Sequence, residues 1–318
     1  MFRFSRCLAA IACLALVPAT AMAKWPDRPV KLVIPFAPGG PNDMVARVWT
    51  DKLGQALGQP FVVDNRGGAT GLIGTEAVVR ADPDGYTLLF GSSSVLAAGL
   101  AARKTSIDPT RDLTPIARAG DLVMGLAVHP SVPVNNVEEF KDYIRKHPGK
   151  LAWGSSGVGG QAHLLIEAMR LSTGLDVLHV PYRGMAEALQ DLLAGQIQVL
   201  MDSAAFGQPG VKLKYLAVLM DQRLPERPDL PTMVEAGLIP VTLTSWYGIY
   251  GPAGLPREVV DTLNAAILEI GKQPELVKTL RARGAVLTPM SPEETGKALE
   301  EQYRTNKELV AKLKLSLD

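Results

Sequence analysis

Two glycine-rich segments, one in each half of the chain, have the composition of loops that bind small anions. The first is Phe36-Ala-Pro-Gly-Gly-Pro-Asn-Asp43 and the second is Trp153-Gly-Ser-Ser-Gly-Val-Gly-Gly-Gln161. Each follows a short apolar run typical of a β-strand and precedes residues with helical apolar spacing. Free N–H groups at a helix start attract anions, with help from the helix dipole. Each loop by itself is equally typical of a plain tight turn, but together they predict a ligand clamped between two lobes.

Neither loop contains Lys or Arg, so a bound carboxylate would be held by backbone N–H groups, serine hydroxyls and water. Asp43 does not suit an anion site, because like charges repel at short range. We expect its carboxylate to turn away and accept the first-turn N–H groups of the following helix. The alternative is that it receives an ammonium or hydroxyl group of the ligand. Arg183 is either a cation for a second ligand charge or a solvated surface side chain.

Enzyme motifs are weak or missing in the sequence. Gly157-Val-Gly-Gly-Gln-Ala162 matches the G-x-G-x-x-A dinucleotide pattern, but it begins in mid-chain and only Asp176 stands near the position of the expected acidic residue. The sequence has no G-x-S-x-G nucleophile elbow and no G-K-[ST] phosphate loop. The histidines lack metal-ligand spacing. His163, in the first turn after the second loop, is either a ligand donor or a histidine of the helix surface or core.

The overall charge argues against a partner selected by bulk electrostatics. The 318 residues include 33 Lys plus Arg and 32 Asp plus Glu, for a formal net charge of +1. We therefore expect no nucleic-acid partner, because phosphate neutralisation needs a basic face. The hydrophobic fraction of 47% is ordinary for a globular protein. The length suggests about two domains.

The first 23 residues have the pattern of a secretory signal peptide. Arg3 and Arg6 precede an apolar run over 8–17, and Ala21-Met-Ala23 fits the small-x-small cleavage pattern. We expect export and cleavage after Ala23. The alternatives are a buried N-terminal helix and lipid attachment at Cys13. Both cysteines of the chain lie in this segment, so the mature protein would have no disulfide.

The elements that must position the two loops alternate between strands and helices. The spacing predicts strands over 30–36, 61–64, 86–90, 122–129, 151–154, 175–182, 197–202 and 214–220. Helices are predicted between them and over most of 256–313. Such alternation favours parallel sheets built from right-handed βαβ units. Because the pattern restarts in mid-chain, we expect two similar α/β halves, joined near 119–123 and again near 241–248.

The motifs resemble those of the Bug/TctC-type solute receptors of tripartite tricarboxylate transporters. They occur in one order along nearly all of the expected mature chain and include Trp25-Pro-Asp-Arg-Pro-Val-Lys-Leu-Val-Ile-Pro-Phe-Ala-Pro-Gly-Gly40, Asp82-Pro-Asp-Gly-Tyr-Thr-Leu-Leu89, Trp153-Gly-Ser-Ser-Gly157, His179-Val-Pro-Tyr-Arg-Gly184 and Ser245-Trp-Tyr-Gly248. The resemblance implies a periplasmic protein with the two-lobed type II periplasmic-binding-protein fold, each lobe a mostly parallel sheet flanked by helices. Lobe 1 would hold residues 24–121 and 246–318, and lobe 2 residues 122–245.

The resemblance also implies which residues line the cleft between the lobes. Ligands of this family are mostly small carboxylates, held between the two loops partly through bound water. Matched residue by residue, the lining falls on Phe36, Ala37, Gly40 and Asp43 in the first loop, on Ser155, Ser156 and Gly157 in the second with His163 beside it, and on Ser92, Ser93, Tyr182, Gly184 and Asp202 at strand ends. The sequence departs from the family pattern near 203–208 and 96–103, which affects one cleft wall and the contact at 92–96.

The function predicted from these patterns is a monomeric receptor that captures a small carboxylate and makes transient contact with membrane transporter subunits. Binding would close the lobes, because only the closed state gains contacts from both. We expect no catalysis, no cofactor and no metal. The alternatives are a ligand sensor for a two-component kinase and a nucleotide-dependent Rossmann enzyme. The ligand stays open among dicarboxylates, tricarboxylates, amino acids and aromatic acids.

Overall fold

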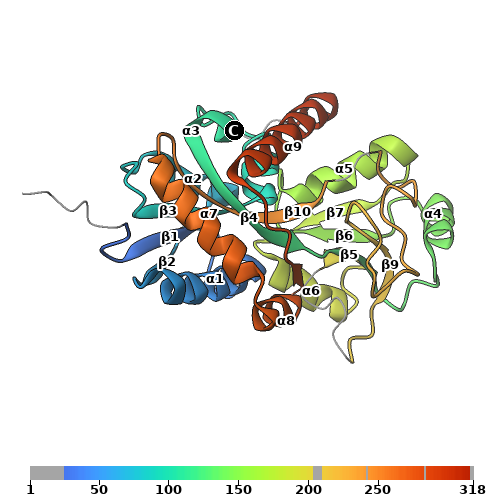
Figure 1. Ribbon diagram of the computed structural model, residues 1–318. Helices are drawn as coiled ribbons and strands as arrows, with labels where there is room; N and C mark the ends of the chain where they lie inside the picture. The colour runs from blue at the N-terminus through green and yellow to red at the C-terminus, as the bar shows by residue number, and fades with distance from the viewer. Residues whose placement is uncertain (1–24, 203–209, 241–242, 283, 316–318) are drawn as a thin grey trace, which may run out of the picture.

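The protein has two α/β lobes that lie side by side in the computed structural model (Figure 1). The structure describes residues 25–202, 210–240, 243–282 and 284–315. The expected signal peptide and its cleavage site lie outside the described residues, as does the segment 203–208.

The first lobe is built on a six-stranded sheet in the order β11-β4-β10-β3-β1-β2. Its strands are β1 (Val30–Ile34), β2 (Phe61–Asn65), β3 (Thr87–Ser92), β4 (Leu113–Leu122), β10 (Ser245–Pro252) and β11 (Ala285–Val286). Its helices are α1 (Pro41–Leu57), α2 (Leu72–Val79), α3 (Pro109–Asp112), α7 (Arg257–Gly271), α8 (Pro274–Arg281) and α9 (Pro292–Leu313), with a 3-10 turn η1 (Ala69–Gly71) and a π-helical turn η2 (Ser94–Gly99). The C-terminal part of the chain, from Ser245 onward, therefore returns to complete this lobe.

The second lobe is built on a five-stranded sheet in the order β7-β6-β8-β5-β9. Its strands are β5 (Gly125–Val128), β6 (Ala152–Ser155), β7 (Leu178–Pro181), β8 (Val199–Asp202) and β9 (Lys214–Val218), and its helices are α4 (Val137–Lys146), α5 (Gln161–Thr173) and α6 (Met185–Leu193). Helix α9 of the first lobe packs on α5 as well as on β4, so it braces both lobes.

The two-lobed α/β architecture is confirmed, but both sheets are mixed rather than mostly parallel. Strand β1 pairs in parallel with β2 and β3, and β6 does so with β7 and β8. In contrast, β10 is antiparallel to β3 and β4, and β5 is antiparallel to β8 and β9. These antiparallel pairs arise because the chain crosses twice between the lobes. Strand β5 enters the second sheet, and β10 the first, at the edge where the parallel strands end, so each must run in the opposite direction to them.

Local sequence signals explain the first helix of each lobe. In α1, Val45, Trp49 and Leu53 follow one another at four-residue steps and are all buried, so one helix face covers the sheet. Gly58 ends this helix in a left-handed conformation (φ 74°) that glycine adopts without a Cβ penalty. At α4, the N-cap residue Asn136 uses its Oδ1 to accept the Glu139 N–H at 2.8 Å, as in a capping box.

The strand predicted over 122–129 is wrong at its start, because Leu122 ends β4 and a new strand begins at Gly125. Strand β4 was not predicted, because it contains charged residues that are not typical of a buried strand. These charges are paired inside the protein: Arg118 Nε donates a hydrogen bond to Asp121 Oδ1 at 2.7 Å, and both side chains are nearly inaccessible. The pairing permits a polar sequence to run through the middle of the fold.

Candidate functional site

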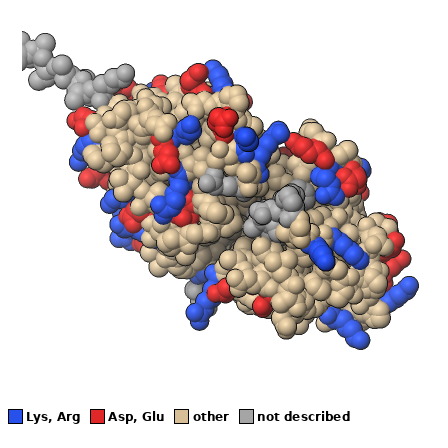
Figure 2. All heavy atoms as spheres, turned by 90° about the horizontal axis from the view of Figure 1, so that it is seen from below, with Lys and Arg blue, Asp and Glu red and all other residues tan. Residues whose placement is uncertain are grey.

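The carboxyl ends of the parallel strands in the two sheets face each other where the chain crosses between lobes. Strand β5 begins at Gly125, opposite Asp202 at the end of β8, and β10 begins at Ser245, opposite Leu122 at the end of β4. The chain passes directly from Leu122 to Gly125, so the two edges are adjoining. The molecular surface is hollowed between the lobes, with charges of both signs interspersed around it (Figure 2). Crevices beyond the carboxyl ends of strands are the usual ligand sites of open α/β sheets.

A buried hydrogen-bonded contact joins the second loop to the first lobe. Ser93 Oγ, just after β3, donates to Gln161 Oε1 at 2.8 Å. The Gln161 amide in turn donates to the Thr244 carbonyl at 3.0 Å, just before β10. The end of the second loop is therefore seated at the end of β3. Because β1 is the hydrogen-bonded neighbour of β3, the first loop starts only about 5 Å further along the sheet edge.

The first loop leaves β1 and leads directly into α1. Gly40 is the N-cap of α1, and no side chain caps this helix start. Phe36 is half-buried and Ala37 is exposed, and the Phe36 carbonyl accepts a hydrogen bond from Asn65 Nδ2 at 3.2 Å. The loop is thus fixed from the β2 side, while the first-turn N–H groups of α1 remain without a side-chain acceptor.

Asp43 turns away as expected, but its hydrogen-bond partners differ from those predicted. Its carboxylate accepts the Gly39 N–H at 2.9 Å, Arg47 Nε at 3.0 Å and Asn65 Nδ2 at 3.0 Å, rather than the first-turn N–H groups of α1. Burial by itself raises the pKa of Asp43, but these hydrogen bonds outweigh it and hold the pKa below its usual value. Ionised Asp43 therefore stabilises the conformation of the first loop through hydrogen bonds to Gly39 and Asn65. The sequence indicates this role through Arg47, which lies four residues after Asp43 and therefore on the same face of the helix.

The second loop contains one enclosed serine and one accessible serine. Ser155 is fully buried, and its hydroxyl lies 2.6 Å from His179 Nε2 and 3.2 Å from both the N–H and the carbonyl of Gly157. Ser156 is half-buried. Gly157 has a φ of 121°, which side chains other than glycine rarely adopt. The Ser155 hydroxyl therefore supports the loop, whereas Ser156 is partly exposed.

His163 is buried beside the second loop and has neighbours at both ring nitrogens. Its Nδ1 accepts the Gly159 N–H at 3.0 Å, and its Nε2 lies 3.9 Å from Glu167 Oε1. Its ring stacks on His179, with centroids 4.2 Å apart. Burial lowers the pKa of His163 and lowers that of His179 to about 4, where the neighbouring His163 adds to the effect. Both imidazoles are therefore neutral at physiological pH.

The other predicted strand-end residues have different roles in the second lobe. The Tyr182 hydroxyl donates to Asp191 Oδ2 at 2.7 Å; burial and this bond raise the pKa of Tyr182 to about 12. Gly184 is the N-cap of α6, again without a side-chain cap. Arg183 is exposed. Asp202 ends β8 with its backbone paired to Gly125, and its side chain is outside what the structure describes.

Ser92 at the end of β3 is paired with a residue that sequence reasoning did not single out. Ser92 and Tyr247 are direct cross-strand neighbours, so their side chains share one face of the sheet. Both hydroxyls are buried, and neither has a hydrogen-bond partner among the described residues. Buried hydroxyls of this kind usually bind ordered water or a ligand. The signal was present in Ser245-Trp-Tyr-Gly248, a motif that was noted without a role for its tyrosine.

The chemistry available at the facing edges is that of anion binding. Helices α1, α5 and α6 start there, and the N-caps Gly40, Gly160 and Gly184 all lack a side-chain hydrogen bond. Within the described part of the chain, no group of three or more His, Cys, Asp or Glu side chains is placed to hold a metal ion. Backbone N–H groups and helix dipoles at these three helix starts supply positive potential there.

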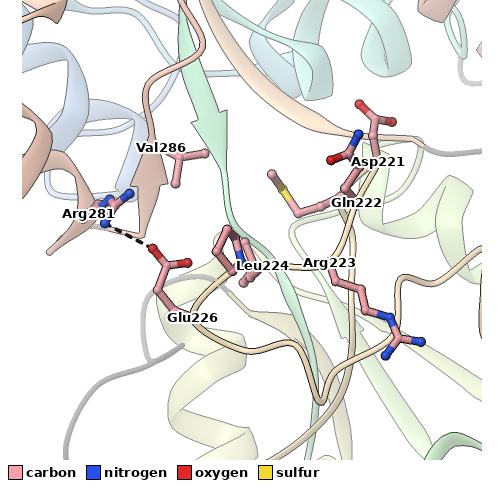
Figure 3. A pocket seen from close by; sticks show the side chains of 9 residues that line it. Asp221, Gln222, Arg223, Leu224, Glu226, Arg281 and Val286 are labelled. Carbon is pink, nitrogen blue, oxygen red and sulfur yellow. Dashed lines mark ion pairs between the residues drawn. The ribbon is translucent and has the colours of Figure 1, made fainter.

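Two cavities lie away from the loops. The first, about 360 Å³, lies beside β9 and β11, where Glu226 and Arg281 form an ion pair at 3.1 Å (Figure 3). Its lining also includes the apolar side chains of Leu224 and Val286. The second, about 350 Å³, is polar and is lined in part by Arg118 and Gln302. Neither includes a residue of the two predicted loops. A search of the described helices finds none long and apolar enough to span a membrane.

A fold of two α/β lobes with ligand-type loops at their facing edges defines the class of two-lobed solute-binding proteins. Residues 45–315 match the sequence model of the tripartite tricarboxylate transporter family receptor, TctC, and the chain belongs to this family. The fold is the type II periplasmic-binding-protein fold, and solved members of the family include periplasmic binding proteins.

Curated and solved relatives cover most of the chain. BugT of Bordetella pertussis is 34% identical over 276 residues, which cover 85% of each protein. The structure of R. palustris Rpa4515 with adipate is 32% identical with a TM-score of 0.83, and the alignment covers 92% of this chain and 99% of that one. MatC from Rhodopseudomonas palustris with bound malate is 30% identical with a TM-score of 0.79, over 90% of this chain and all of that one. Both solved relatives thus hold small dicarboxylates.

Proposed function

We propose that this protein is a periplasmic receptor that captures a small carboxylate between its lobes and delivers it to a tripartite tricarboxylate-type membrane transporter. The observation that carries the proposal is the convergence of three glycine N-caps, Gly40, Gly160 and Gly184, at the facing strand edges. Each helix start offers N–H donors that no side chain satisfies. The adipate and malate held by the solved relatives support a dicarboxylate as the ligand.

The ligand carboxylates would be held by backbone and hydroxyl donors rather than by arginine or lysine. In the first loop these donors are the N–H groups around Ala37 and Gly40, and in the second they are Ser156 and the backbone beside Gly157. Ser92 and Tyr247 provide hydroxyls that are buried and unsatisfied within the described structure, and ordered water would link them to the ligand. Asp43, Ser155 and His163 act behind the loops, because their polar atoms contact the loop backbone.

Ligand binding would favour the closed arrangement of the lobes. A dicarboxylate that reaches both loops gains both sets of contacts only when the facing edges approach, so its differential affinity shifts the equilibrium toward closure. A micromolar dissociation constant corresponds to about −8 kcal/mol. Several charge-assisted hydrogen bonds, each contributing roughly 1.5–3 kcal/mol, suffice for this affinity. The closed form would then be the one that the transporter recognises, and the ligand would leave chemically unchanged.

The test is a calorimetric and thermal-shift titration with matched charged and neutral probes. Adipate and malate should raise the melting temperature and bind in calorimetry, whereas dimethyl adipate, which has the same chain without the charges, should do neither. Ser156→Ala should weaken binding at least fivefold, while Ser106→Ala, at an exposed serine of the first lobe, should not. Equal binding of the diester and the diacid would refute anion capture. Recovery of the probe as a changed product would refute a purely binding role.

A further inference from the structure

Two histidines from different elements form a stacked pair directly behind the second loop. His163 lies in the first turn of α5 and His179 in β7, next to β6. Their rings are 4.2 Å apart between centroids and only 15° from parallel. Both residues come from motifs that the sequence singled out, but the proposed binding function assigns neither of them a ligand contact.

Each imidazole contacts a different point of the loop. His179 Nε2 lies 2.6 Å from Ser155 Oγ, the hydroxyl that contacts both backbone groups of Gly157. His163 Nδ1 accepts the Gly159 N–H at 3.0 Å. The two ring nitrogens therefore hold the backbone at the beginning and at the end of the turn between β6 and α5. Two glycines with positive φ would otherwise leave this turn with wide conformational freedom.

The contact at Gly159 requires an unprotonated nitrogen. A backbone N–H can only donate, so a proton on His163 Nδ1 would place two donors against each other. The charged groups around the pair are Glu167 and Arg170 on α5, which are paired with each other at 3.0 Å. Glu167 favours a protonated His163 and Arg170 opposes it, but burial has the larger effect and keeps the ring neutral.

We propose that His163 and His179 are positioning residues of the binding site, whose ring nitrogens fix the backbone of residues 155–159 in the shape that presents its N–H groups and Ser156 to a carboxylate. This inference rests on the proposed function. It assigns the pair no contact with the ligand. The two histidines act by pre-organising the loop, so that the ligand does not have to order it on binding.

The test compares substitutions that keep the hydrogen bond of each histidine with substitutions of similar volume that remove it. Asparagine at 163 places an acceptor oxygen near the Nδ1 position, and glutamine at 179 places an amide group, which can donate or accept, near the Nε2 position. His163→Asn and His179→Gln should bind adipate or malate within threefold of the wild type. His163→Leu and His179→Leu should bind at least tenfold more weakly. His147→Leu, at the end of α4, is the control and should bind like the wild type.

A second readout needs no ligand and is therefore independent of the proposed function. Amide hydrogen exchange of residues 157–159 should be at least tenfold faster in His163→Leu than in the wild type, but close to wild type in His163→Asn. Equal exchange and equal affinity in the leucine and asparagine variants would overturn the positioning role. If the leucine variants do not fold, a tenfold loss of affinity for adipate or malate in both His163→Asn and His179→Gln would also overturn the positioning role. If neither adipate nor malate binds the wild type, the proposed ligand class fails, while the exchange result still decides the role of the histidines.

Discussion

Ser93 and Gln161 form a buried hydrogen bond that ties the two lobes together: the Ser93 hydroxyl donates to Gln161 Oε1 at 2.8 Å. The same glutamine uses its amide to bind the backbone just before β10. One side chain at the start of α5 thus contacts the end of β3 and the second crossing between lobes. It sets the position of the second loop relative to the first sheet.

Gln161→Leu should destabilise the protein, because it leaves the buried Ser93 hydroxyl without its acceptor and the Leu243 carbonyl without the Gln161 amide. Each unsatisfied buried group costs about 1–3 kcal/mol. Chemical denaturation should show a drop of about this size in the free energy of unfolding, and Ser93→Ala should show a smaller one. Gln190→Leu, at an exposed position on α6, is the control. Wild-type stability in Gln161→Leu would contradict the assigned contact.

Gly184→Asp should separate fold stability from ligand binding. The backbone at Gly184 is extended (φ −167°) and an added Cβ would meet no atom within 4 Å, so a side chain is accommodated. An aspartate there would cap α6, and good N-caps contribute about 0.5–2 kcal/mol. The same carboxylate would occupy the anion position and repel a ligand carboxylate. We expect a higher melting temperature together with at least tenfold weaker adipate binding in calorimetry.

Gly184→Ser is the matched comparison, since it caps the helix without charge. It should keep most of the stability gain and lose less affinity than the aspartate variant. Tight adipate binding by Gly184→Asp would show that the start of α6 does not face the ligand.

The stacked histidines predict a loss of stability in mild acid. The pKa of His179 is about 4 in the folded protein, below its ordinary value of 6.5, so the unfolded chain binds the proton more readily. The contribution of neutral His179 to the free energy of unfolding is complete above pH 6.5, falls as the pH drops from 6.5 toward 4, and is lost below pH 4. Because solvent partly screens this group, the free energy of unfolding should fall by on the order of 1–3 kcal/mol.

The measurement is the free energy of unfolding of wild type and His179→Gln between pH 4 and 8. Other carboxylates titrate in this range in both proteins, so the difference between the two curves isolates the histidine. The wild type should lose more stability than His179→Gln between pH 6.5 and 4. Parallel curves would contradict a neutral, desolvated His179.

The ion pair between Glu226 and Arg281 (Figure 3) lies near β11 and the end of β9, on one side of the lobe crossing. Strands β9 and β11 flank the crossing on that side, and β8 and β10 flank it on the other. Closure toward the loops should therefore pull this pair apart. Removal of the pair by Glu226→Gln should therefore favour the closed arrangement and tighten adipate binding. Exposed ion pairs contribute roughly 0–1 kcal/mol, so the dissociation constant should fall by no more than about fivefold.

The control for this variant is Asp261→Asn, which removes the ion pair to Arg257 within α7 and should leave the dissociation constant unchanged. A dissociation constant that rises in Glu226→Gln would show that the pair supports the closed form instead.

Much of the architecture could be predicted because hydrophobic runs and glycine turns alternate regularly along this chain. The strand ends that place the loops after Ile34 and Ser155 follow from such local signals. Strand β4 could not be predicted in this way, because its Arg118 and Asp121 are tolerated only through their contact in the fold. The antiparallel strands also follow from the path of the chain between lobes rather than from any local pattern.

The candidate site could be predicted as a pair of loops but not as a set of side-chain roles. The resemblance implied that Ser155 and His163 line the cleft, but a single sequence does not distinguish a side chain that faces a ligand from one that contacts the loop backbone. The distinction depends on hydrogen bonds between residues distant in sequence, such as Ser155 with His179. Tyr247 lacked a predicted role because its relation to Ser92 depends on the register of β3 and β10.

The most direct test of the account is amide hydrogen exchange of both loops with and without a saturating small carboxylate. Adipate should slow exchange of the first-turn amides after Gly40 and, in the same titration, of residues 156–160, because one ligand bridges both lobes. Dimethyl adipate at the same concentration should leave both segments unchanged. Protection of only one loop, or of neither while adipate binds, would contradict a carboxylate held between the two glycine-rich loops.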